Sequence, residues 1–226
     1  MKHLILSLII FLLYVNSLNA QTTTDRSVRL SFTINSSFNW MSSGETTISR
    51  KKMAAGTDFG INADFFFDTA NRYAFATGLL VSSMGGEMTY NTNENFQFAK
   101  EEFQSGTSIR YRLHYLEIPT MLKLYTNQFD RWTYWTQFGL SNYINISAKA
   151  DSNDGQLHRS DIDDEVKLFN MALNVGLGGQ YDLGGGNAVI IGLIYNGGFT
   201  DITSGKHIPD EKMTLSSMKL KLALLF

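Results

Sequence analysis

Apolar and polar residues alternate along most of the chain beyond residue 27. In residues 28–35, for example, Val, Leu, Phe and Ile occupy every second position, with Arg, Ser, Thr and Asn between them. Side chains of a β-strand point alternately to its two faces, so this period of two predicts strands with one apolar and one polar face. Similar segments recur at about 59–68, 74–82, 109–125, 134–145, 173–181, 189–199 and 217–226. The sequence therefore predicts an all-β protein with eight strands.

The connections between these segments are alternately long and short. The long ones cover roughly 41–56, 85–107, 148–166 and 200–213, and the short ones lie near 69–72, 126–131 and 183–187. Antiparallel outer-membrane barrels have this arrangement, with long outer loops and short periplasmic turns. Tilted strands of about ten residues would span the apolar layer of a bilayer. We therefore expect an eight-stranded antiparallel transmembrane β-barrel with both ends on the periplasmic side.

The polar strand faces carry few charges and many small residues, among them Gly60, Gly78, Gly139, Gly176 and Gly192. The interior of an eight-stranded barrel is only wide enough for side chains, and small residues relieve crowding there. A soluble exported lipocalin-like binding barrel is the alternative, because alternation alone fits it equally well. The outer face of a soluble barrel, however, should be dominated by charged residues. The few charges on the polar strand faces of this chain therefore favour a barrel whose apolar face is turned to lipid.

Aromatic residues occur near the ends of the predicted strands. They are Trp40, Phe67, Tyr73, Tyr125, Trp132, Tyr134, Tyr181 and Phe199. Their amphipathic rings suit the two interfaces of a bilayer. The competing explanation is that aromatic residues favour β-strands in general. The interface explanation and the propensity explanation carry about equal weight.

Residues 1–20 have the layout of a secretory signal peptide. Lys2 supplies a positive start, residues 4–18 are mostly apolar, and Ala20 is the small residue before the expected cleavage site. An uncleaved membrane anchor is the alternative, although the apolar run is short for a spanning helix. We expect residues 21–226 to form the mature barrel domain, located in the cell outer membrane.

The last predicted strand has the features of an assembly signal. Leu222 and Leu224 alternate with polar or small residues, and the aromatic Phe226 follows in the same phase. A terminal aromatic residue after alternating apolar positions resembles the signal read by the outer-membrane barrel assembly machinery. The expected partners are therefore outer-membrane lipid and this machinery, while any extracellular or periplasmic partner is unknown.

Five charged residues lie on polar strand faces and are expected inside the barrel. They are Asp64, Glu117, Lys123, Lys219 and Lys221. Buried charges in a narrow interior are stable when they pair with one another, which is the favoured interpretation. A proton or ion path is the functional alternative.

Other site chemistry finds little support in the sequence. The net charge of −2 gives no electrostatic case for nucleic acid, and the histidines have no metal-ligand spacing. The chain has no cysteine, no Gly-x-Ser-x-Gly elbow and no glycine-rich phosphate loop, so we expect neither an enzyme nor a cofactor. Residues 151–155 hint at a calcium loop, but the glycine comes one place early and Ile162 occupies the final ligand place. A solvated surface loop is expected there.

The segment 109–125 carries a family resemblance. Its apolar phase shifts near Tyr115, which predicts a bulge there. Tyr115-Leu116-Glu117-Ile118-Pro119 and the following Met121-Leu122-Lys123-Leu124-Tyr125 resemble the PorT-like outer-membrane β-barrel family typical of Bacteroidota. The glycine-rich segment 174–181 and the Asn19-Ala20-Gln21 end of the signal peptide are also similar to that family. The resemblance implies an outer-membrane barrel and assigns no activity.

The expected function is a structural or interaction role carried by the outer loops, rather than that of a general diffusion porin. Besides the charges, the interior should hold five bulky residues that leave little room for a water column: Phe66, Trp135, Tyr143, Ile190 and Ile194. A narrow channel or small-ligand passage is the alternative within the membrane class.

Overall fold

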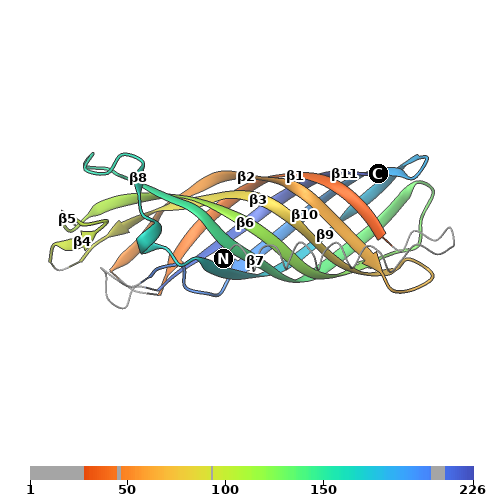
Figure 1. Ribbon diagram of the computed structural model, residues 1–226, viewed down its shortest axis with the longest axis horizontal. Helices are drawn as coiled ribbons and strands as arrows, with labels where there is room; N and C mark the ends of the chain where they lie inside the picture. Colours follow the sequence, from red (N-terminus) through yellow and green to blue (C-terminus); the bar gives the residue numbers. More distant parts are fainter. Residues whose placement is uncertain (1–27, 45–46, 93, 205–211) are drawn as a thin grey trace, which may run out of the picture.

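Eight long antiparallel strands close into a barrel in the computed structural model, which describes residues 28–44, 47–92, 94–204 and 212–226. They are β1 (Val28–Ser43), β2 (Ile48–Phe66), β3 (Tyr73–Tyr90), β6 (Thr107–Tyr125), β7 (Trp132–Ser152), β9 (Phe169–Gly184), β10 (Asn187–Gly198) and β11 (Met213–Leu225). Each pairs with the next, and β1 pairs with β11 to close the ring (Figure 1). The predicted all-β, eight-stranded antiparallel barrel is confirmed.

Smaller elements lie at one end of the elongated barrel, opposite the end where β11 finishes (Figure 1). They are β4 (Phe96–Phe98), β5 (Glu101–Phe103), β8 (Ser160–Asp161) and the short 3-10 helix η2 (Asp163–Glu165). The end with the long connections is the outer end and the end with the short turns is the periplasmic end of such a barrel. No helix among the described residues is long and apolar enough to cross a membrane. The proposed signal peptide, residues 1–20, lies outside the described part of the chain.

The barrel carries its apolar residues outside. On β11, Leu220 is 60% exposed and Leu222 is 55% exposed, whereas Lys219 and Lys221 between them are buried. The same alternation holds on β1, where Phe32 and Ile34 point outward and Thr33 and Asn35 point inward. This distribution is opposite to that of a soluble lipocalin-like barrel and suits a wall that is covered by lipid.

The strands are longer than expected, which corrects two predictions. The segment 41–56, expected as a loop, is mostly strand, because β1 runs to Ser43 and β2 begins at Ile48. Residues 85–90 and 148–152, also expected in loops, are strand as well. The expected phase shift is absent within β6, where odd-numbered residues point inward throughout 109–125. The extra residue of the bulge lies in β7, because Tyr115 pairs with Asn145 and His114 with Ser147.

Both corrections have one physical cause, which is that the interior changes from polar to apolar along the barrel. Glu117 and Lys123 point inward in the inner part of β6, but Tyr111, Leu113 and Tyr115 point inward in its outer part. There the outward residues become polar, so the apolar face of the strand changes sides. In the sequence this inversion resembles a shift of phase or a polar loop.

The aromatic residues near the strand ends divide into two groups. Phe67, Tyr73, Tyr134 and Phe199 point outward, as residues at a bilayer interface would. Tyr125 does not, because it lies in the inward phase of β6 and is only 6% exposed. Its hydroxyl donates a hydrogen bond to Asp64 inside the barrel. The expectation that Tyr125 lies at the interface is therefore wrong.

A charge placed on the lipid-facing wall tests the orientation of the strands. Leu220 lies in the middle of the outward apolar run of β11. Leu220→Arg should lower the free energy of unfolding in lipid vesicles by about 2–4 kcal/mol, the cost of an arginine near the bilayer centre. Leu220→Phe is the control and should change it by less than about 1.5 kcal/mol. Equal effects of the two substitutions would argue against a lipid-facing position.

Candidate functional site

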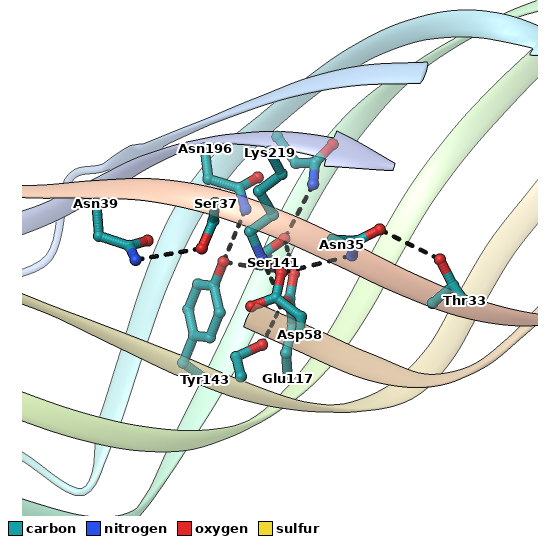
Figure 2. A network of polar contacts seen from close by, with 12 residues as sticks. Thr33, Asn35, Ser37, Asn39, Asp58, Glu117, Ser141, Tyr143, Asn196 and Lys219 are labelled. Carbon is teal, nitrogen blue, oxygen red and sulfur yellow. Dashed lines mark hydrogen bonds and ion pairs between the residues drawn. The ribbon is translucent and has the colours of Figure 1, made fainter. Parts of the chain in front are cut away.

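A three-residue ion cluster occupies the middle of the barrel interior. Lys219 on β11 places its Nζ 2.8 Å from Asp58 Oδ2 of β2 and 2.7 Å from Glu117 Oε2 of β6. The strands β11, β2 and β6 are not neighbours in the ring, so the cluster spans the lumen (Figure 2). All three residues are buried. One ammonium group thus joins two carboxylates from different sides of the barrel.

Hydroxyl and amide groups donate hydrogen bonds to the two carboxylates. Glu117 accepts hydrogen bonds from Ser82 at 2.8 Å and from Ser141 at 2.9 Å. The amide of Asn35 donates to Asp58 at 3.4 Å. Tyr143 donates a longer bond of 3.4 Å to Glu117. Figure 2 shows how these side chains from several strands converge on the cluster. A buried carboxylate is costly unless it is paired and hydrogen-bonded. Both carboxylates here are paired and accept hydrogen bonds, although Asp58 Oδ1 has no hydrogen-bond partner among the described residues.

A second ion pair lies closer to the periplasmic end. Lys123 Nζ is 3.0 Å from Asp64 Oδ2, which also accepts the hydroxyl proton of Tyr125. The same ammonium lies 4.9 Å from the ring centre of Trp135. Lys221 has its Nζ 5.8 Å from that ring centre, and no ion pair of Lys221 is present among the described residues. Three lysines thus face three carboxylates in the barrel interior.

The structure brings the five predicted interior charges together. Asp64, Glu117, Lys123, Lys219 and Lys221 all line one cavity of about 30 Å³. A water molecule needs about 10–15 Å³ of such space, so the cavity holds only a few waters. Within the described residues there is no cluster of His, Asp or Glu that could hold a metal ion. The arrangement is suited to fixing strands in place, and all of these charged groups except Lys221 form ion pairs with one another among the described residues.

Sequence reasoning missed Asp58, the second carboxylate of the cluster. The residue lies in the same phase as Gly60, Asn62 and Asp64, all of which point into the barrel. That alternation was the available signal. Residue 58 was overlooked because it follows the stretch 41–56 that was expected to be a loop.

An apolar cap closes the outer end of the barrel. The β4–β5 hairpin folds back so that Phe96 stacks on Tyr90 at 4.9 Å and Phe98 meets the ring of Tyr111 at 5.8 Å. Leu157 and Ile162 from the next outer loop are also buried in this cluster. The outer end is therefore filled by side chains of the barrel wall and of its own loops.

The periplasmic end is filled by a separate apolar cluster. Phe66 packs against Tyr125, with ring centres 5.4 Å apart, and Trp135 and Ile190 belong to the same group. The five bulky residues expected inside the barrel are all buried there or in the layers above: Phe66, Trp135, Tyr143, Ile190 and Ile194. The lumen thus consists of an apolar inner layer, a polar middle layer and an apolar outer layer.

The expected assembly residues lie on the outer wall beside the closing seam. Leu222 and Leu224 pair with Ile34 and Phe32 of β1, and both leucines are exposed. Phe226 is 55% exposed, and its backbone N–H donates a hydrogen bond of 3.1 Å to Leu30 O. All three side chains are therefore accessible from the lipid phase.

Removal of the central ammonium tests the energetic role of the cluster. Lys219→Met leaves Asp58 and Glu117 buried without a counter-charge, which should lower the free energy of unfolding by about 3–5 kcal/mol. The triple variant Lys219→Met/Asp58→Asn/Glu117→Gln removes the stranded charges and should recover most of this loss. Urea unfolding in detergent, followed by tryptophan fluorescence, measures both. A loss of less than about 1 kcal/mol in the single variant would show that the cluster does not act as a unit.

Comparison with known proteins extends this description. The family model described as "Outer membrane protein beta-barrel domain" matches residues 19–223. No curated protein shows significant sequence similarity to the chain. Among solved structures, Neisserial surface protein A is 14% identical, with 87% of this chain and 95% of that chain covered and a TM-score of 0.46. OprG of Pseudomonas aeruginosa is 10% identical, with 88% and 96% covered and a TM-score of 0.45. Because the family model covers most of its length, the chain belongs to the outer membrane protein beta-barrel domain family and is a small β-barrel protein of the outer membrane.

Proposed function

We propose that this barrel has a structural or interaction role through its outer loops and does not act as a general diffusion porin. The observation that carries the proposal is the filling of the lumen at three levels. Passive diffusion of solutes needs a continuous water column. A cavity of about 30 Å³ between two apolar layers does not supply one.

The outer loops are suited to interaction because the barrel holds them in place. The β4–β5 hairpin is anchored by the buried rings of Phe96, Phe98 and Phe103. Its tip, with Lys100, Glu101 and Glu102, is exposed. A loop that is fixed before binding loses less conformational entropy when a partner docks. This feature supports recognition of a partner at the cell surface.

We further propose PorT-like membership within the family, based on the segments 115–125 and 174–181. The proposed partners are outer-membrane lipid and the barrel assembly machinery, and the loop partner is unassigned. A non-enzymatic role is also part of the proposal. Its support is that the two described histidines are exposed in different places, His114 on β6 and His158 in the loop between β7 and β8.

A narrow channel is the second candidate, and one observation favours it. The polar cavity borders Lys221, for which no ion pair is present among the described residues. A charged group of this kind can serve an ion or proton path. The conduction measurement below separates the two candidates.

Planar-bilayer recording of the purified protein tests the main proposal. We expect no steady single-channel steps, because the apolar layers above and below the cavity exclude a water column. Steady steps that disappear in Gly176→Trp would overturn the proposal and favour the channel. Gly176 is suitable for this control because a side chain there would point at Ile194 and Gln137 in the lumen.

The assembly role of Phe226 predicts a position-specific defect. Phe226→Asp should lower the amount of folded protein in the outer membrane at least several-fold, because the signal strand loses its aromatic residue. Phe67→Asp is the matched control, since Phe67 is another exposed aromatic residue, 65% exposed and next to a periplasmic turn. Immunoblots of unheated and boiled membrane fractions give the folded amounts. Equal levels for the two variants would contradict the signal role.

A further inference from the structure

A basic groove lies on the outer surface of the wall, where β2, β3, β6 and β7 run side by side. Its volume is about 580 Å³. The basic residues lining it are Arg110, Arg112, His114, Lys149 and Arg159. No acidic residue lines it among the described parts of the chain. The groove therefore concentrates positive charge on one side of the barrel.

The strand register forces like charges together in this groove. Arg112 of β6 lies directly opposite Lys149 of β7, and Asp161 of β8 lies opposite Lys149 on its other side. Like charges in facing positions of a sheet are destabilising. An anion bound between the two cations would reduce this repulsion.

Within the described part of the chain, the neighbouring carboxylates form ion pairs with some of these cations but not with Lys149 or Arg159. Asp151 accepts a hydrogen bond of 2.7 Å from Arg112 Nε, and Glu87 lies 3.0 Å from Lys51 Nζ. For Lys149 and the Arg159 side chain, no ion pair is present within the described residues. These two groups are exposed and free to bind an external anion.

The position of the groove relative to the membrane indicates the kind of anion. Along β6 the outward residues from Leu124 to Leu116 are apolar except for Thr120, and the next outward residues are His114, Arg112 and Arg110. The change from apolar to basic marks the outer boundary of the bilayer. Headgroup phosphates of the outer leaflet lie at this level, with their acyl chains beside the apolar positions below.

We propose that the groove binds the phosphate of an anionic glycolipid in the outer leaflet. The planar guanidinium groups of Arg112 and Arg159 match the geometry of phosphate oxygens, and Lys149 adds a compact charge. The exposed Ile146 and the partly exposed Leu116 on the same two strands offer an apolar surface for acyl chains. The site is distinct from the tip of the β4–β5 hairpin on which the proposed loop function rests, because it lies on the outer side of β6 and β7 and in the loop that holds Arg159.

Thermal unfolding of the protein purified in detergent from outer membranes tests this site. The probes are diphosphoryl lipid A, lipid A with both phosphates removed, and inorganic phosphate. The test variant is Lys149→Gln/Arg159→Gln, which removes two cations without breaking an ion pair of the described residues. The control is Arg72→Gln/Arg131→Gln, which removes the same charge at the periplasmic turns.

We expect diphosphoryl lipid A to raise the unfolding midpoint, with an apparent Kd at least ten-fold weaker in the test variant and unchanged in the control. The dephosphorylated lipid should give little shift. A Kd within two-fold of the original in the test variant would overturn the proposal, as would an equal shift with the dephosphorylated lipid. A full shift with inorganic phosphate alone would overturn the assignment to a lipid and indicate a site for soluble anions.

Discussion

The pairing of β1 with β11 is the interaction on which the rest of this structure depends. Residues 31–43 of β1 pair with 213–225 of β11 in antiparallel register, so the sheet has no open edge within the membrane. Unpaired backbone groups cost several kcal/mol each in lipid, so a β-sheet is stable there only when it closes into a barrel. Closure with eight strands then makes the interior narrow. Trp135 fits inside because it packs against Gly178 and Gly192, where a Cβ atom would lie within 2.5 Å of its ring.

The narrow interior explains the polar middle layer. A sheet that faces lipid on one side must place its polar residues on the other, and here they meet across a short distance. Buried ion pairs contribute little net stability but penalise arrangements that separate the partners. Lys219 forms ion pairs with Asp58 and Glu117, which lie on strands that are not its neighbours. A shift in the register of any one of these β-strands would therefore leave a buried charge without its partner. We infer that the cluster selects the correct register during closure.

The alternation of the sequence predicted the number of strands, since period two depends only on the geometry of a strand. The long and short connections predicted the antiparallel order, and the small, weakly charged polar faces predicted the lipid-facing side. The alternation also identified five of the charges that point into the lumen. It could not identify which charges meet, because contacts such as that between Lys219 and Glu117 cross the barrel and depend on strand stagger. The true length of the strands was hidden where the interior becomes apolar at Tyr115. The basic groove was missed for the same reason, since Arg110 and Lys149 belong to stretches whose outward face is polar.

Crosslinking across the closing seam tests the account most directly. The chain has no cysteine, so pairs can be introduced singly. Phe38 and Met218 are exposed and face each other across β1 and β11. A short bifunctional thiol reagent should join Phe38→Cys to Met218→Cys within one chain in native membranes. It should not join Phe38→Cys to Leu222→Cys, which lies about 14 Å further along β11 at the usual rise per residue. Failure of the first pair, or equal crosslinking of both, would contradict the closed barrel in this register.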